Sequence, residues 1–396
     1  MQKFIFFVIF ISINSFVFTQ TLVRLDKSQL SAQQLDLRIG QLMKEASVTG
    51  MAISVFNDNK AVYHKVFGYK NSDTKVPLQT NTNFYGASLS KAVFAVMVMK
   101  LVEEKIISLD KPLQQYLSKP VYEYGKGKSW NEDFTSLKDD QLYKKITARH
   151  CLSHSSGFAN WRWYEPDQKL RVHFEPGSQY SYSGEGLCYL QFVIEKLTGK
   201  SLNELMQEKV FGPLKMKNSS YSWQPEFETN YCLGHDKSGK AYPKDKDNAP
   251  RSASTLETTP DDYKLFTEAV LQKKILNPAT YDIFFKRQLR IRSQFQMGTD
   301  AWKDSTTEND PILLGYALGW GRLQTPYGFA VFKEGHGDGF QHYSILFPEK
   351  KMGIVILANS DNAESIFKEL LEFAIGDKFT PWKWQRYIPY NQKTDQ

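Results

Sequence analysis

The sequence has 396 residues, enough for one large domain or two lobes with an ample core, and 41% of them are hydrophobic. The formal net charge of +7 is modest, and the densest basic run, residues 286–292, is typical of a solvated face, so we expect no nucleic-acid partner. Three cysteines are too few for a disulfide scaffold, and the seven histidines show no metal-binding spacing, so we expect neither a metal nor another cofactor.

The first 20 residues are typical of a secretory signal peptide. A basic start, with Lys3, precedes an apolar run over residues 4–18, although an uncleaved membrane anchor is an alternative. No later stretch is long and apolar enough to span a bilayer. We therefore expect a secreted or periplasmic protein without a membrane span after signal removal. The sequence indicates no particular oligomeric state.

Predicted strands lie near both ends of the chain. An amphipathic helix at residues 35–46 precedes strand-like runs at 51–56 and 61–67, which flank a polar hairpin turn. Extended runs return late, and a helix that ends at Gly376 follows them. The late strands are expected at residues 327–333, 342–347 and 352–358, and the late helix at 363–375.

The region between these strands is mostly helical, with a polar surface insertion at residues 122–145. The simplest architecture is an α/β (α+β) fold, with one antiparallel sheet built from both chain ends, flanking helices and an inserted helical lobe. We expect a single domain over residues 21–385 and a polar tail over 386–396. The expected sheet lobe takes residues 21–108 and 315–380, and the helical lobe takes residues 109–314.

The segment at residues 84–107 predicts a helix that is apolar on every side over residues 92–99, as is typical of a helix in the centre of a protein. Ser88 and Lys91 share one face of its first turn. Burial disfavours the charged form of a lysine, so Lys91 can accept the proton of Ser88 and make the hydroxyl a nucleophile. Three other Ser-x-x-Lys matches lie in polar turns or on an exposed helix face, at Ser72, Ser108 and Ser365.

Two later segments hold further candidates. Tyr182 stands just before a predicted helix at residues 187–197, where its side chain can project into a cleft. A nearby cationic lysine would favour its phenolate, so the tyrosine could shuttle a proton. Tyr180 is a second candidate for this tyrosine, and simple packing is the alternative. A glycine-rich segment around His336 lies between two late strands, where a ligand can approach the backbone closely. An incidental histidine in a glycine-rich turn is the alternative there.

Taken together, these segments resemble the penicillin-recognising serine hydrolases, in particular their class C β-lactamase-like branch. That family carries Ser-x-x-Lys, then Tyr-x-Asn, then Lys-Thr-Gly or His-x-Gly, in the order seen here. The loop at residues 146–157, which ends His-Ser-Ser-Gly, is similar to the family's His-Thr-Ser-Gly loop. The resemblance covers roughly residues 36–372, and it implies a β-lactamase/transpeptidase-like fold.

The resemblance also implies catalytic roles. Ser88 would be the acylated nucleophile, with Lys91 as its proton acceptor or electrostatic partner. Tyr182 would be the general base and acid, and His336 would stand where other members have a lysine. The backbone N–H groups of Ser88 and Gly339 would form the oxyanion hole.

Further residues concern the substrate and the departures from the family pattern. We expect Trp161, Gly337 and Gly339 to contact the substrate, a small molecule or a peptide. Gly184 replaces the Asn of Tyr-x-Asn, which removes a hydrogen-bond acceptor for Lys91, and Glu185 is a candidate to replace it.

The resemblance thus implies a serine hydrolase that forms an acyl-enzyme with an ester, a small amide, a D-amino-acid peptide or a β-lactam, and the predicted signal peptide implies that it is exported. The alternative is a catalytically silent member that binds cell-wall peptides or a protein partner. An α/β-hydrolase is disfavoured, because the chain contains no Gly-x-Ser-x-Gly.

Overall fold

The computed structural model describes residues 21–127, 129–246, 248–298 and 303–392. The predicted signal peptide and the last four residues of the predicted tail lie outside this range. Among the described residues, the helices are too short or too polar to cross a membrane.

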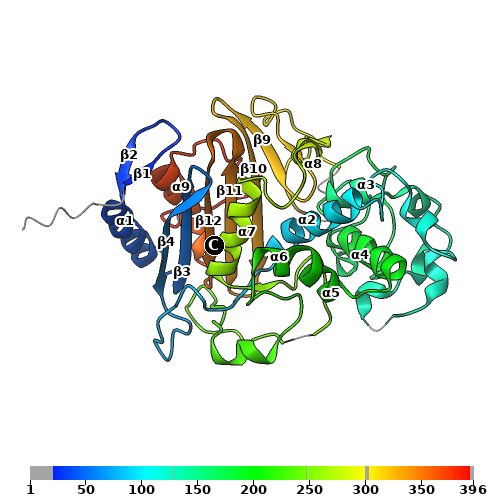
Figure 1. Ribbon diagram of the computed structural model, residues 1–396, viewed down its shortest axis with the longest axis horizontal. Helices are drawn as coiled ribbons and strands as arrows, with labels where there is room; N and C mark the ends of the chain where they lie inside the picture. Colours follow the sequence, from blue (N-terminus) through cyan, green and yellow to red (C-terminus); the bar gives the residue numbers. More distant parts are fainter. Residues whose placement is uncertain (1–20, 128, 247, 299–302, 393–396) are drawn as a thin grey trace, which may run out of the picture.

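One eight-stranded antiparallel sheet forms the centre of the molecule (Figure 1). Its strand order is β4-β3-β12-β11-β10-β9-β8-β7, so the hairpin from the N-terminal region pairs with the last strand of the chain. This pairing confirms the predicted sheet built from both chain ends. The strands are β3 (Gly50–Asn57), β4 (Lys60–Gly68), β7 (Leu289–Arg290), β8 (Gly315–Tyr316), β9 (Gly321–Thr325), β10 (Gly328–Gly337), β11 (Phe340–Phe347) and β12 (Met352–Ala358).

Two small two-stranded sheets complete the β-structure of the described residues. One joins β1 (Thr21–Val23) to β2 (Gln29–Ser31), beside the start of the first helix. The other joins β5 (Phe84–Tyr85) to β6 (Glu257–Thr258), and it ties the segment before Ser88 to a distant part of the chain.

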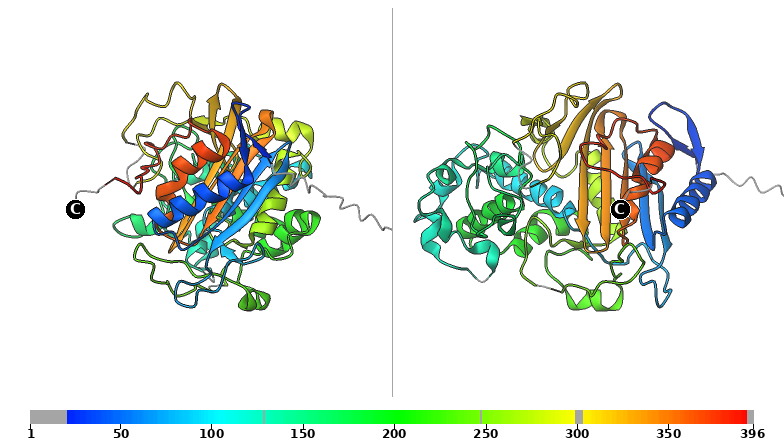
Figure 2. Two further views of the ribbon diagram at one scale, coloured as in Figure 1. Left: turned by 90° about the vertical axis from the view of Figure 1, so that its left-hand side faces the viewer. Right: turned by 180° about the vertical axis from the view of Figure 1, so that it is seen from behind.

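Helices cover both faces of the large sheet. α1 (Ala32–Glu45) and α9 (Phe367–Ile375) lie side by side across one face (Figure 2). α7 (Pro260–Leu271) packs on the other face, against β3, β4 and β12 (Figure 1). Apolar side chains of the sheet point to both layers, which is why β3 and β12 are buried throughout.

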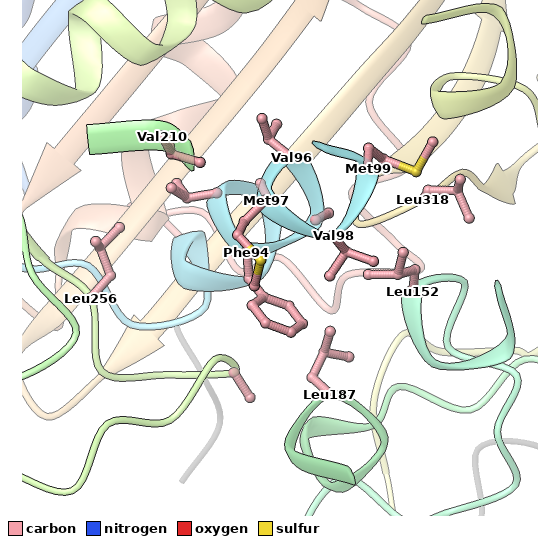
Figure 3. Packing of buried hydrophobic residues seen from close by; sticks show 14 of the residues in the cluster. Phe94, Val96, Met97, Val98, Met99, Leu152, Leu187, Val210, Leu256 and Leu318 are labelled. Carbon is pink, nitrogen blue, oxygen red and sulfur yellow. The ribbon is translucent and has the colours of Figure 1, made fainter. Parts of the chain in front are cut away.

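α2 (Leu89–Glu103) is the predicted apolar helix, and it lies in the centre of the larger core cluster (Figure 3). Phe94, Met97 and Val98 are fully buried, and Figure 3 shows Phe94 beside Leu187 and Val98 beside Leu152, both from the helical region. Burying each such side chain contributes about 1.5–3 kcal/mol. This core holds the first turn of α2 in place, where Ser88 and Lys91 stand.

The region between the strands consists of short helices. α4 (Gly184–Thr198) begins after Ser183, whose hydroxyl accepts the N–H of Gly186, and ends at Gly199 in the left-handed conformation. It starts three residues earlier than expected, because this cap lies ahead of the apolar stretch. The other helices of the described region are α3 (Ala148–Leu152), α5 (Leu202–Met206), α6 (Gly212–Leu214) and α8 (Pro278–Phe284).

Two segments expected in the helical lobe lie with the sheet instead. α7 packs on the sheet, and β7 pairs with β8 at its edge. The expected surface insertion at residues 122–145 forms short 3-10 turns whose Phe134 and Tyr143 are fully buried, so it belongs partly to the core.

Candidate active site

Ser88 and Lys91 meet at the start of α2. The Lys91 Nζ is hydrogen-bonded to the Ser88 Oγ at 2.8 Å, and it donates to the carbonyl oxygen of Ala253 at 2.6 Å. Ala87, just before the serine, has a φ of 45°, a left-handed conformation that residues with a Cβ rarely adopt. Strained backbone of this kind is concentrated at functional sites. The turn therefore presents Ser88 at the end of a rigid, buried helix.

Lys91 is placed to be uncharged. Its side chain is buried, and burial, followed by the repulsion of the nearby Lys333, lowers the pKa of Lys91 well below its ordinary value. The rings of Tyr182 and Trp161 surround the amine, with centroids 5.0 and 5.9 Å from Nζ. A neutral amine at this position can accept a proton from Ser88.

Tyr182 stands between α3 and the start of α4, beside Ser88. Its ring packs on His154 at 4.2 Å, and its hydroxyl accepts a hydrogen bond from the Lys333 Nζ at 3.0 Å. Burial raises the pKa of Tyr182 to about 12, against the opposing effect of Lys333. We expected the nearby lysine to favour the phenolate, but burial outweighs it, so the group is a neutral phenol. Tyr180, the second candidate, packs away from this point against Tyr316 and Trp384.

Lys333 is a site residue that sequence reasoning missed. It lies on β10 with no exposed side-chain surface, and its Nζ donates to the Glu334 Oε1 at 2.6 Å as well as to Tyr182. Burial works against both charges, but Glu334 raises the pKa of Lys333, and Lys333 lowers that of Glu334. Tyr182 therefore lies between a neutral Lys91 and a charged Lys333. The signal was present, because Lys333-Glu334-Gly335 is a Lys-x-Gly triplet like the family's Lys-Thr-Gly.

The structure corrects two expected placements in the third motif. His336 does not take the place of the family's lysine, since Lys333 holds it. The His336 Nε2 lies 3.2 Å from the Glu364 Oε1, and this pairing raises the pKa of the histidine although burial opposes its charge. Gly339 is wrong as an oxyanion donor, because it lies in the turn after β10 and its N–H donates to Asp361 at 3.0 Å.

These groups open into a cavity of about 360 Å³. Its floor contains Ser88, Lys91 and Tyr182, and an aromatic wall defined by Tyr85, Trp130, Trp161, Trp163 and Tyr164 lines it. Gly337 lies next to this wall, because a Cβ at that position would be 2.5 Å from the Tyr85 ring. The remaining lining residues are Asn160, Arg251, Ser254, Met297 and His336. The described residues form no cluster of His, Cys, Asp and Glu suited to a metal ion.

The family model described as Beta-lactamase matches residues 35–374, most of the chain. The chain belongs to the beta-lactamase family. It is 24% identical over 338 residues to Protein flp of Staphylococcus aureus strain MW2, which covers 83% of this chain but only 63% of the length of that curated relative.

Solved structures show the same fold. The octameric penicillin-binding protein homologue from Pyrococcus abyssi has a TM-score of 0.70 and 22% identity, over 90% of this chain and 80% of that one. EstCE1, a hydrolase with promiscuous acyltransferase activity, has a TM-score of 0.68 and 17% identity, over 87% of this chain and 98% of that one. The chain therefore has the predicted β-lactamase/transpeptidase-like fold.

Gly184, the departure from the beta-lactamase family's Tyr-x-Asn, is explained by Trp161. A Cβ at position 184 would lie 2.4 Å from the Trp161 indole, so the ring occupies the space that an Asn side chain would need. Lys91 keeps an acceptor nonetheless, because the carbonyl of Ala253 bonds to its amine. The Trp161 indole thus lies where the family has the Asn amide, and the hydrogen bond between Ser88 and Lys91 remains.

Glu185 is wrong as a substitute acceptor for Lys91, because its carboxylate is bound to Arg162. The Glu185 Oε1 accepts the backbone N–H and the Nε–H of Arg162, both at 2.9 Å, and its Oε2 lies 2.8 Å from a terminal guanidinium nitrogen. The pair is almost fully buried. It fixes the loop that carries Trp161 and Trp163, on either side of Arg162.

We expect Glu185→Gln to lower the free energy of unfolding by about 3–5 kcal/mol, because it leaves a buried guanidinium without its carboxylate. Urea unfolding measures this change. Asp167→Asn is the matched control, since it breaks the exposed Arg171–Asp167 pair of the same loop and should cost less than about 1 kcal/mol. Equal losses for the two variants would contradict the role given to Glu185.

Proposed function

We propose that the protein is a serine hydrolase that forms an acyl-enzyme on Ser88. The observation that carries this proposal is the buried lysine, of lowered pKa, hydrogen-bonded to the Ser88 hydroxyl at 2.8 Å. A serine is a weak nucleophile unless an adjacent base takes its proton. Neutral Lys91 is such a base.

The proposed acylation uses the three polar groups beside Ser88. As the Ser88 oxygen attacks the carbonyl carbon of the substrate, Lys91 takes the hydroxyl proton. Tyr182 gives its phenolic proton to the leaving group, and the charged Lys333 stabilises the resulting phenolate. Proton return from Lys91 to Tyr182 restores both groups. In deacylation a water molecule attacks the acyl carbon, Tyr182 and Lys91 take its proton, and a proton returns to the Ser88 oxygen as the bond between that oxygen and the acyl group breaks.

Backbone N–H groups would stabilise the oxyanion. The edge of β10 runs beside the start of α2, because a Cβ at Gly335 would lie 3.4 Å from the backbone nitrogen of Leu89. β9 pairs with β10 only as far as Phe332 among the described residues, so this edge is open next to Ser88. We assign the oxyanion hole to the N–H of Ser88 and the N–H of His336, in place of Gly339.

The substrate class is an ester, a small amide, a D-amino-acid peptide or a β-lactam. The structural neighbours support this range, since one is a hydrolase with acyltransferase activity and another is a penicillin-binding protein homologue. The aromatic wall would contact an apolar part of the substrate, since Trp163 and Tyr164 are about half exposed at 47% and 48%. Export from the cell, which rests on residues 1–20, belongs to the same proposal.

A silent binding protein is the second candidate, and Gly184 is the feature that favours it. In that case Ser88 would bind ligands without forming a covalent bond. The hydrogen bonds of Lys91 to Ser88 and to Ala253 support the enzyme instead, because a silent protein has no need of a neutral base at a serine.

A fluorophosphonate probe tests the proposal. We expect one adduct per chain by intact mass, located on Ser88 by peptide mapping, because Ser88 is the serine next to the neutral lysine. The buried Ser155, Ser156 and Ser183 near the site serve as internal controls. Labelling of one of these serines in place of Ser88 would overturn the assignment.

A further inference from the structure

The cation next to the nucleophile is already neutralised by a carboxylate. The Lys333 Nζ lies 2.6 Å from the Glu334 Oε1, and the side chains of the two residues are 0% and 3% exposed. The second carboxylate oxygen, Glu334 Oε2, is buried without a hydrogen-bond partner. The pair is therefore close to neutral as a unit. The Glu334 Oε2 keeps a partial negative charge that no hydrogen-bond donor satisfies.

The other titratable groups near Ser88 are balanced in the same way. Lys91 is held neutral by burial and by Lys333, and His336 is paired with Glu364 at 3.2 Å. Arg251 also lines the cavity, where it lies over the Trp130 ring at 5.8 Å from its centroid. Lys91, Lys333 and His336 thus present no unpaired positive charge beside Ser88 among the described residues, and Arg251 adds a positive charge to the cavity wall.

A substrate carboxylate next to the scissile bond meets an unfavourable field here. An unpaired lysine beside Tyr182 would attract such a group, but the carboxylate of Glu334 cancels this attraction. Like charges in a site of low dielectric repel each other strongly, and removing a carboxylate from water without a partner adds a further cost. An uncharged ester avoids both penalties, and the aromatic wall suits an aryl group.

We propose that Glu334 is a specificity-determining residue that excludes substrates with a carboxylate beside the scissile bond, so that the site selects uncharged aryl esters. Penicillins, cephalosporins and peptides with a free C-terminal carboxylate at the scissile residue are disfavoured. This inference rests on the proposed serine hydrolase function.

The first test compares the hydrolysis by the wild-type protein of two substrates that differ only by one carboxylate group, phenyl acetate and 3-carboxyphenyl acetate. We expect the kcat/KM for the uncharged ester to be at least about tenfold higher, although the carboxylate changes the leaving group little. Equal values would overturn the inference and leave the serine hydrolase standing. If neither ester is hydrolysed faster than by Ser88→Ala, the proposed function itself fails.

The second test uses Glu334→Thr, which converts the triplet to Lys-Thr-Gly, and the isosteric Glu334→Gln. Both variants free the charge of Lys333, so both should lower the ratio of phenyl acetate to 3-carboxyphenyl acetate kcat/KM by about tenfold or more. The ratio of the two kcat/KM values is compared, and not each value by itself, because Glu334 also positions Lys333. Loss of Glu334 will therefore reduce the hydrolysis of both esters. Nitrocefin, a cephalosporin, should gain relative to phenyl acetate in the same variants.

Glu364→Gln is the matched control, since it removes the partly exposed carboxylate that is paired with His336, a residue of the cavity lining. We expect it to change the ratio by less than about threefold. A change as large as that of the Glu334 variants would show that net charge decides selectivity, and Glu334 would lose its assigned role. An unchanged ratio in folded Glu334 variants would overturn the inference as well. If these variants do not fold, the comparison of the two esters with the wild-type protein decides whether the inference holds.

Discussion

Ser88→Ala is expected to lower kcat/KM for an activated aryl ester by roughly four to six orders of magnitude, the scale seen when a catalytic nucleophile is removed. The physical reason is that no other hydroxyl is hydrogen-bonded to Lys91 among the described side chains. Loss of the Oγ therefore removes the covalent route, and only binding and polarisation of the ester remain. Steady-state hydrolysis of p-nitrophenyl acetate measures the effect.

Ser108→Ala is the control for this prediction. Ser108 belongs to another Ser-x-x-Lys match, but it lies in an exposed loop, where its hydroxyl accepts the N–H of Asp110. We expect the activity of Ser108→Ala to stay within about twofold of that of the wild type, as for surface changes away from a site. A wild-type protein no faster than Ser88→Ala would refute the enzyme and favour the silent binder.

Lys91→Arg is expected to reduce kcat/KM by about 10²–10⁴-fold, the range for loss of a general base. A guanidinium stays protonated at all ordinary pH values, so it keeps a positive charge beside Ser88 but accepts no proton. Lys91→Met, which is uncharged and similar in length, is the matched variant. If Lys91 is the base, both variants lose activity to a similar extent, and a nearly active Lys91→Arg would instead make Lys91 an electrostatic partner.

The pH dependence of the wild type gives a second measure of the same role. Because burial and Lys333 lower the pKa of Lys91, its neutral form exists well below the ordinary pKa of a lysine. We expect kcat/KM to be retained at neutral pH and to fall only as the pH drops through this lowered pKa. Tyr182, with a pKa of about 12, stays protonated throughout. A kcat/KM that rises only as the pH approaches the ordinary pKa of a lysine would contradict the role of neutral Lys91 as the base.

Local patterns were enough to predict much of the fold. The apolar run that became α2 has no polar side, so only the centre of the protein could hold it. The hairpin of β3 and β4 and the late strands β10 to β12 were predicted for similar reasons, since alternation and turn residues act over a few positions. The proximity of Ser88 and Lys91 was predictable for the same reason, because a helix turn brings positions i and i+3 together.

The tertiary structure alone decided the partners of those residues. Ala253 bonds to Lys91 across 162 positions, and Lys333 reaches Tyr182 across 151, so both contacts depend on how separate segments pack. Trp161 fills the space beside Gly184 for the same reason.

The charge states of the site residues also depended on the tertiary structure. The sequence suggested that a lysine would favour the Tyr182 phenolate, but burial by distant segments raises its pKa. The Lys333–Glu334 pair has the same origin, since two neighbours on a strand become a buried ion pair only where the surrounding core excludes water. The sequence by itself determined which residues lie at the first turn of α2, because helical geometry is local. Only the tertiary structure decided which of the two lysines is charged, because burial and long-range contacts set the pKa of each.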